Sequence, residues 1–323
     1  MNNKGSLIKN LKVLSLIAGI LIVVGIAGAW WLSDSVGGTI TIEERVNIEN
    51  IESVSIRTSV QSVRIHHAAN SEARIISSGI PTNATLTAEV VNGVLTVETR
   101  WPRQFGINFG SFTERPTLDV YLPTTMYEQI TIRTSTGRIE ISDFTVNDLQ
   151  IEATTGAVEV SDIIGDVNIR TSTGRITASG ITGDDLYFRA TTGNVELTDM
   201  RGDVNVQTST GRITASGVTG DDFYFRVTTG NVELSHVTGH IDGQTSTGRI
   251  TINNTTIAQN MNLQATTGNV AINLEREPEN ARFSLTTTTG RRSIFGQDNA
   301  TEQFGDGRYE VTLRTSTGRI TVE

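Results

Sequence analysis

Hydrophobic and polar residues alternate along most of this chain, on both sides of a recurring Thr-Gly dipeptide. Around Gly174, for example, Val167 and Ile169 precede the glycine, and Ile176 and Ala178 follow it, with one polar residue inside each pair. A period of two predicts a short β-strand with one buried face on either side of the glycine. Glycine at the junction allows the positive φ of a tight corner. The pattern therefore predicts an all-β fold built from strand–corner–strand units.

These units recur with a fixed period. The sequence Thr-Ser-Thr-Gly-Arg-Ile occurs five times, and its first four glycines are 37 residues apart: Gly137, Gly174, Gly211 and Gly248. A Thr-Thr-Gly variant lies between successive copies, so the basic unit has 18 to 20 residues. Units of fixed period stack so that each covers the apolar face of the next. We predict a parallel two-sheet β-solenoid with 18–20-residue coils. An antiparallel meander is the alternative, but identical corners at identical positions favour stacking.

The position after the corner glycine also alternates, with arginine in one unit and a neutral residue in the next, as in Arg175, Asn194 and Arg212. Like charges directly opposite across strands are destabilising. We interpret the two-unit period as a means of keeping these arginines apart in the stack.

The first 32 residues follow another pattern. Residues 13–32 are an uncharged, mostly apolar run of 20, long enough to cross a bilayer as a helix. Lys4, Lys9 and Lys12 precede the run, whereas every acidic residue follows it, which predicts a cytoplasmic N-terminus and an extracytoplasmic C-terminal part. The alternative is a cleaved signal peptide, because residues 27–29, Ala-Gly-Ala, resemble a cleavage site. The length of the apolar run favours an uncleaved single-pass anchor in the cell membrane.

These patterns divide the chain into five parts. We predict a cytoplasmic tail at 1–12, a transmembrane helix at 13–32, a linker at 33–38, an irregular β region at 39–129 that caps the solenoid, and the β-solenoid repeat domain at 130–323. A final coil, 309–323, ends the chain.

The net charge and the cysteine content limit the classes of partner and of chemistry that the chain can have. All lysines precede the apolar run, so the rest of the chain has 23 basic and 35 acidic residues, a net charge of −12. This excess disfavours nucleic acid as a partner. The chain contains no cysteine, which excludes disulfides and thiol chemistry.

Three features together resemble a known family: residues 118–123, Leu-Asp-Val-Tyr-Leu-Pro, then residues 130–139, Ile-Thr-Ile-Arg-Thr-Ser-Thr-Gly-Arg-Ile, then the repeated Thr-Gly units. They resemble the bacterial "putative adhesin" family, β-strand-repeat proteins of unknown function that often have one N-terminal membrane anchor. The layout is also similar to LiaG-like proteins associated with cell-envelope stress. The resemblance implies a surface or binding role, and it supplies no catalytic residue.

The best candidate binding surface lies on one predicted strand face and contains Tyr187, Arg189, Tyr224 and Arg226. Tyrosine and arginine are enriched at interface hot spots, and an aromatic ring can stack on a sugar. A second candidate is the loop 102–116 with its three phenylalanines, Phe105, Phe109 and Phe112, which we expect to pack on the end of the solenoid.

The other polar groups are interpreted as ordinary surface residues, and no catalytic, metal or cofactor site is predicted. They are the four histidines, the pairs Asp184-Asp185 and Asp221-Asp222, and a glutamate column of Glu140, Glu159, Glu196 and Glu233. Glycosidic cleavage needs two carboxylates with different pKa values, whereas a periodic column offers no distinguished pair.

We therefore predict a non-enzymatic, adhesin-like binding or scaffolding module of the cell envelope, without a cofactor. Its expected partner is a cell-wall polymer or glycan, or a membrane or envelope protein. Two alternatives stay open. One is an accessory or regulatory protein of an envelope stress response, acting through a membrane partner because residues 1–12 are too short to signal alone. The other is a carbohydrate-active enzyme.

Overall fold

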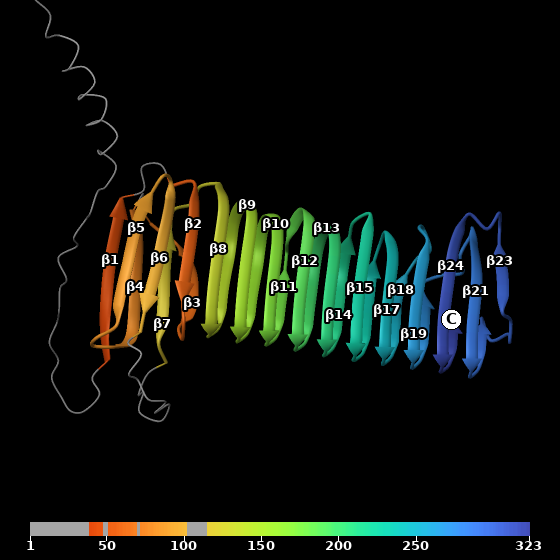
Figure 1. The fold of residues 1–323 in the computed structure, drawn as a ribbon. Coiled ribbons are helices and arrows are strands. Elements are labelled where there is room, and N and C mark those ends of the chain that lie inside the picture. The colour runs from red at the N-terminus through yellow and green to blue at the C-terminus, as the bar shows by residue number, and fades with distance from the viewer. Residues whose placement is uncertain (1–38, 48–50, 70–71, 102–114) are drawn as a thin grey trace, which may run out of the picture.

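The computed structural model describes residues 39–47, 51–69, 72–101 and 115–323, and every regular element in these ranges is a β-strand (Figure 1). No helix in these ranges is long and apolar enough to cross a membrane. The predicted transmembrane segment 13–32 and the three phenylalanines of the loop, Phe105, Phe109 and Phe112, lie outside the described residues.

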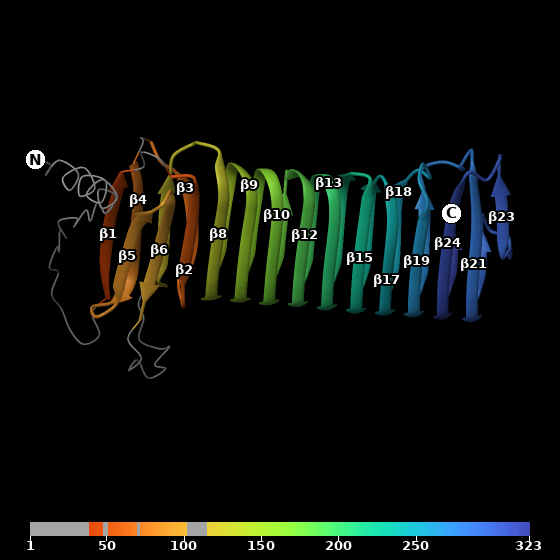
Figure 2. The same ribbon diagram turned by 45° about the horizontal axis from the view of Figure 1, so that its top comes forward.

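The strands stack into a rod whose two long sides are parallel ladders (Figures 1 and 2). The first ladder contains, in spatial order, β6 (Val94–Arg100), β2 (Ser53–Thr58), β8 (Tyr127–Thr136), β9 (Ile139–Thr155), β10 (Val158–Thr173), β12 (Thr182–Thr192), β13 (Val195–Thr210), β15 (Asp222–Thr229), β17 (His240–Thr247), β19 (Met261–Thr267), β24 (Tyr309–Thr317) and β21 (Ala281–Thr289).

The second ladder contains β7 (Thr117–Leu122), β3 (Ser62–His67), the first parts of β9 and β10, β11 (Ile176–Ser179), the first part of β13, β14 (Ile213–Thr219), β16 (Val232–Val237), β18 (Ile250–Thr255), β20 (Val270–Leu274), β25 (Ile320–Val322) and β22 (Arg292–Ile294). The long strands β9, β10 and β13 pass from one ladder to the other.

Equivalent residues of successive coils are directly opposite one another. Val167, Leu186 and Val204 form one such column, and Ile176 and Val195 belong to another. The prediction of parallel, in-register stacking is confirmed for the coils, and an antiparallel meander is excluded there.

The inward columns form one continuous core between the ladders. Ile169, Phe188, Val206 and Phe225 are fully buried in a single column. Gly243 occupies the next place in that column, where a Cβ atom would lie 2.0 Å from the ring of Phe225. Gly243 therefore makes room for the phenylalanine of the preceding coil.

The Thr-Gly corners bring backbones into close contact from coil to coil. The N–H of Gly193 donates to the carbonyl oxygen of Thr210 (2.9 Å). A Cβ atom on Gly193, whose φ is +150°, would lie 1.8 Å from the carbonyl oxygen of Gly174 in the preceding coil. Only glycine fits there, because any side chain would have to push the coils apart.

A further corner, beyond the glycine corners that the sequence predicts, uses aspartate as well as glycine. Asp162 (φ 54°), Gly180 (φ 65°) and Asp199 (φ 55°) occupy it in successive coils, all in the left-handed region. A short polar side chain makes aspartate more tolerant of this region than most residues. Each coil therefore turns here, three residues before the next glycine (Gly165, Gly183 or Gly202), and then enters the first ladder. The coil thus has a short third side.

The residue after the corner glycine has a structural role in addition to spacing charge. Asn194 Oδ1 accepts a hydrogen bond from the backbone N–H of Arg212 (3.0 Å), and Asn231 Oδ1 accepts one from Arg249 (2.9 Å). Each asparagine therefore satisfies an outward-facing donor of the next coil, and the alternation of asparagine with arginine provides one such bond every two coils.

The ends of the rod depart from chain order. The coil of β24 and β25 lies between that of β19 and β20 and that of β21 and β22, so the last coil of the chain lies inside the stack. Similarly, β2 and β3 lie between β6 and β7 on one side and β8 and β9 on the other.

The coil of β2 and β3 has no Thr-Gly corner. The buried side chain of Gln61 lies at its turn and donates to Ser77 Oγ (2.7 Å) and to the carbonyl of Thr117 (2.9 Å).

Antiparallel strands cover both ends. At one end, β5 (Thr85–Val91) pairs with β6, β4 (Glu72–Pro81) with β7, and β1 (Thr39–Asn47) with β4; at the other, β23 (Thr301–Phe304) pairs with β21. A parallel stack exposes unpaired backbone groups at each end, so a change of strand direction there limits its extension by further coils.

We expect Gly193→Ala to lower the free energy of unfolding by about 3 kcal/mol or more, because the new Cβ meets a backbone oxygen that cannot rotate away. Gly296→Ala is the matched control. Its φ is also positive, at +78°, but nothing lies within 4 Å of the added Cβ, so the cost should be about 1 kcal/mol. Chemical denaturation followed by circular dichroism compares the two. Equal losses would show that the close approach of coils is not limiting.

Ala157 occupies the column in which Asn194 and Asn231 accept hydrogen bonds. Ala157→Asn should therefore place an acceptor beside the N–H of Arg175 and raise the free energy of unfolding by about 1 kcal/mol. Asn231→Ala makes the reverse change and should lower stability by a similar amount. A destabilised Ala157→Asn variant would contradict this role of the column.

Candidate functional site

The predicted binding residues lie on the outer face of the first ladder, in two matching rows. Along β12 the outward residues are Asp185, Tyr187, Arg189 and Thr191, and along β15 they are Asp222, Tyr224, Arg226 and Thr228. The strand period of two turns these side chains outward, while Leu186, Phe188 and Ala190 between the first four are buried. The same alternation in β15 gives the second row.

One strand separates the two rows. β13 lies between β12 and β15, and its Asn205 is opposite both Tyr187 and Tyr224. The tyrosines are therefore two coils apart, about 10 Å along the rod. Both are partly exposed, and together with Asn168, Asp185 and neighbouring residues they line a shallow depression of about 420 Å³. The structure therefore brings the four predicted residues together on one face.

Arginines pack against both tyrosines. The guanidinium carbon of Arg170 lies 5.2 Å from the ring centroid of Tyr187, and that of Arg226 lies 5.7 Å from the ring centroid of Tyr224. Arg226 also donates through Nε to the side-chain oxygen of Gln244 (2.7 Å), with that amide oriented to satisfy both groups. These contacts place a guanidinium group beside each tyrosine ring on the face.

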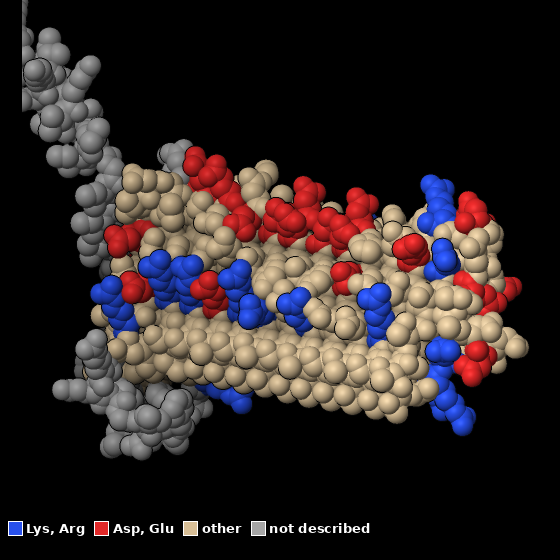
Figure 3. Space-filling view, turned by 45° about the vertical axis from the view of Figure 1, so that its right-hand side comes forward, with Lys and Arg blue, Asp and Glu red and all other residues tan. Residues whose placement is uncertain are grey.

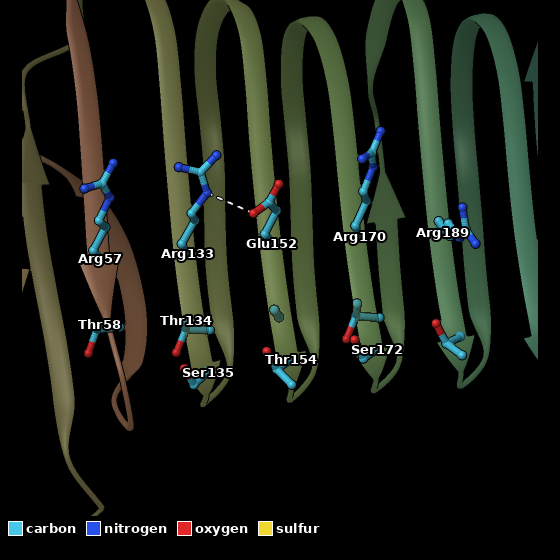
Figure 4. Close-up of a pocket in the computed structure, with 13 residues that line it drawn as sticks. Arg57, Thr58, Arg133, Thr134, Ser135, Glu152, Thr154, Arg170, Ser172 and Arg189 are labelled. Atoms are coloured by element: carbon cyan, nitrogen blue, oxygen red, sulfur yellow. Dashed lines mark hydrogen bonds and ion pairs between the residues drawn. The ribbon is translucent and has the colours of Figure 1, made fainter.

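The arginines form a column that the sequence analysis recognised only in part. Arg57, Arg133, Arg170 and Arg189 line a neighbouring groove of about 550 Å³, above a row of serine and threonine hydroxyls (Figure 4). Arg133, Arg170 and Arg189 each stand four residues before a Thr-Gly glycine, so their common offset was readable from the sequence. Arg57 has no such glycine, and only the pairing of β2 with β8 places it beside Arg133.

One acidic residue interrupts this column. Glu152 lies between Arg133 and Arg170 and pairs with Arg133 (Nε···Oε2 2.9 Å; Figure 4). At the end of the column, Glu98 lies opposite Arg57. The hydrogen bond from Arg100 lowers the pKa of the Glu98 carboxyl, and the charges of Arg100 and Arg57 add to the effect.

Charge is arranged in bands along the rod. Figure 3 shows a row of basic side chains with an acidic row beside it and a broad uncharged band on its other side. The outward residues of β12 follow the same order as these bands: acidic Asp185, then basic Arg189, then the uncharged hydroxyl of Thr191.

The acidic column has a structural function. Asp166 Oδ1 accepts from the backbone N–H groups of Asp184 and Asp185 (2.9 and 3.0 Å), and Asp203 Oδ1 does the same for Asp221 and Asp222 (both 3.0 Å). The two aspartate pairs noted in the sequence therefore supply backbone donors at a corner, and the acceptors Asp166 and Asp203 were missed.

The glutamate column lies on the second ladder among arginines. Arg138 Nη1 is 3.3 Å from Glu140 and 3.5 Å from Glu159, and Arg175 Nε is 3.7 Å from Glu196. These carboxylates therefore form ion pairs with arginines of the same or a neighbouring coil.

His66 and His67 are separated from the tyrosine rows, whereas His240 on β17 lies opposite Asp222 of the second row. His66 stacks on Tyr121 (centroids 4.8 Å apart) and lies 3.0 Å from Asp119, while His67 stacks on Phe144 (4.5 Å). His240 Nδ1 contacts the carbonyl of Asn260 (2.8 Å). Within the described ranges, no group of three or more His, Cys, Asp or Glu side chains is arranged to hold a metal ion.

Residues 51–182 and 161–323 each match the Toastrack DUF4097 family, and together the matches cover most of the chain. The chain belongs to the Toastrack family. No curated protein matches the sequence significantly.

Several solved structures are similar to this Toastrack protein at low identity. A "putative adhesin" from Bacteroides fragilis NCTC 9343 is 12% identical, with 88% of this chain and 97% of that chain covered and a TM-score of 0.34. A "putative lipid binding protein" from Parabacteroides distasonis ATCC 8503 is 14% identical, with 89% and 98% covered and a TM-score of 0.35. A "putative cell adhesion protein" from Clostridium sporogenes ATCC 15579 is 12% identical, with 88% and 99% covered and a TM-score of 0.23. These scores are too low to carry an argument about this chain.

Proposed function

We propose that this Toastrack protein is a membrane-anchored, extracytoplasmic binding or scaffolding module of the cell envelope. It acts without catalysis and holds a cell-wall polymer or glycan on the face that contains Tyr187, Arg189, Tyr224 and Arg226. The observation that carries the proposal is the matching pair of outward rows on β12 and β15, with one tyrosine and one arginine in each.

The spacing of these rows suits a linear ligand. The tyrosines repeat after two coils, about 10 Å along the rod, on a ladder that continues well beyond them in both directions. This distance is close to the repeat of an extended disaccharide. An exposed aromatic ring can stack on a sugar, while the neighbouring arginine donates hydrogen bonds to its oxygens.

Two features of the sequence support a location outside the cell membrane with an N-terminal anchor in it. The apolar run 13–32 follows the only lysines of the chain, and Trp30 and Trp31 stand at its end, where aromatic residues mark a membrane interface. In this arrangement the β-rod stands outside the membrane, attached by the linker 33–38.

The non-enzymatic role is supported by the arrangement of carboxylates. On the second ladder they recur at one position of the coil, with threonine in some coils, beside Arg138 and Arg175, and on the first ladder Asp166 and Asp203 accept backbone hydrogen bonds. Acid–base cleavage of a glycosidic bond instead needs one distinguished pair on either side of the bond.

Tyr187→Ala combined with Tyr224→Ala should reduce retention of the protein on isolated cell-wall polymers at least about tenfold, because truncating a tyrosine hot spot costs about 2 kcal/mol. The measurement is a pull-down of the full-length protein in a nonionic detergent. Tyr309→Ala, which removes a partly exposed tyrosine from β24, should bind normally.

Unchanged retention of the double variant, with its circular dichroism preserved, would exclude this face. Retention of a detergent-solubilised membrane protein without any polymer binding would instead favour the accessory role in envelope stress that the LiaG-like layout suggests.

A further inference from the structure

We propose that the groove lined by Arg57, Arg133, Arg170 and Arg189 binds a linear polymer that carries phosphate groups, laid along the axis of the rod. The inference rests on the proposed function and specifies the chemistry of its ligand. The groove continues the same ladder face, because Arg170 and Arg189 also border the tyrosine rows.

The groove reverses the charge of the protein locally. The chain as a whole carries a net charge of −9, yet the groove is lined by four arginines and one glutamate. Among these arginines, only Arg133 forms an ion pair with a carboxylate of the described residues, that of Glu152. Other outward arginines do pair with acids, as Arg64 does with Asp119 (2.9 Å) and Arg175 with Glu196 (3.7 Å). Three guanidinium groups without an ion-pair partner among the described residues, those of Arg57, Arg170 and Arg189, therefore lie together in the groove.

Arginines occupy directly opposite positions here. Arg170 is opposite Arg189, and Arg57 is opposite Arg133, on strands about 4.8 Å apart. Such pairs are unfavourable without an anion between them. One repeat later, the residue equivalent to Arg170 is Gln207, beside Arg226, so the adjacent pair is a departure from the repeat and not a requirement of it.

Adjacent guanidinium groups favour phosphate over carboxylate. Arginine binds either anion through two parallel N–H donors. A carboxylate has two oxygens in one plane, so a bidentate guanidinium on the edge between them leaves only the outer lone pairs for a second one. A tetrahedral phosphate group has oxygens on more than one side and can accept from two guanidinium groups at once. The pair Arg170 and Arg189 therefore matches one phosphate group.

Neutral donors flank these cations. Ser135, Thr154 and Ser172 are exposed in a row beneath the arginines (Figure 4), and Thr191 is the corresponding exposed residue of β12. Their hydroxyls can bond the uncharged oxygens of a polymer backbone between its phosphate groups. The groove crosses the strands from β2 to β12, about 19 Å along the rod, so it accommodates an extended chain with several anionic groups.

The acidic column does not oppose this binding strongly. Asp185 precedes Arg189 by four residues on β12, which separates their backbones by about 13 Å. Exposed charges beyond a Debye length of about 8 Å are largely screened at physiological ionic strength. A polymer on the hydroxyl side of the arginines therefore lies outside the range of strong repulsion.

The probe is linear inorganic polyphosphate, titrated into the full-length protein in nonionic detergent and followed by isothermal calorimetry. We expect saturable binding that weakens as salt rises, and much weaker binding of orthophosphate. Polygalacturonate, a carboxylate polymer, should bind at least about tenfold more weakly. Equal binding of polygalacturonate would overturn the preference for phosphate. Absence of saturable polyphosphate binding would overturn the proposal.

Arg170→Gln combined with Arg189→Gln should weaken polyphosphate binding at least about tenfold, because two charged hydrogen-bond donors are lost. The matched control is Arg212→Gln with Arg249→Gln. It removes the same charge from exposed arginines after the corner glycines, and it should change binding less than about twofold. Equal losses in the two variants would show that only net charge matters and would overturn the groove as a site.

Glu152→Gln provides a gain-of-binding test. It removes the one carboxylate of the groove and frees Arg133, so polyphosphate should bind several-fold more tightly. Glu196→Gln makes the same charge change on the second ladder, beside Arg175, and should have little effect. No gain for Glu152→Gln would contradict binding along the arginine column.

These measurements also separate the inference from the proposed function. Retention on cell-wall polymers that depends on Tyr187 and Tyr224, without polyphosphate binding, would overturn the phosphate site and leave the proposed function standing. Polyphosphate binding that depends on Arg170 and Arg189, without retention on any wall polymer, would support the site and count against the envelope role.

Discussion

The structure depends on the close approach of backbones at the Thr-Gly corners. A Cβ atom on Gly174 would lie 1.8 Å from the carbonyl oxygen of Gly156, and the same contact recurs at Gly193, Gly211 and Gly230. Each coil is therefore seated directly on the preceding one, with the N–H of the corner glycine bonded to the next coil. Because the corners fix the register, every other residue of the repeat also falls in a column.

That register converts a period along the sequence into bands across a surface. Inward columns become a continuous core, in which Gly243 admits the ring of Phe225. Outward columns gather residues that are one or two coils apart, so Tyr187 and Tyr224 share a face, and Arg170 meets Arg189. A rod of this kind offers a linear ligand the same chemistry at regular intervals, which a globular surface of similar size does not.

At each end of the rod, the terminal coil has an exposed strand edge that must be covered. Parallel ladders leave unpaired backbone groups at both ends, and here antiparallel strands, β4 and β5 at one end and β23 at the other, lie over the terminal coils. The coil of β24 and β25 is inserted before that of β21 and β22, so the chain terminates inside the rod (Figure 1). The antiparallel strands work against edge-to-edge association.

The sequence by itself determined the coil: strands of period two, a glycine corner, parallel stacking every 18–20 residues, and the alignment of the four predicted surface residues. These features follow from local periodicity, because alternation and glycine spacing are properties of neighbouring residues. The order of coils at the ends was decided only by the tertiary structure, as was the coil of β2 and β3, whose turn uses Gln61 in place of a glycine. The place of Arg57 in the arginine column was also decided by the tertiary structure, because Arg57 is 76 residues from Arg133 in the chain but opposite it in the ladder. Pairing between distant segments depends on which exposed edge each strand can cover, and no local pattern encodes that choice.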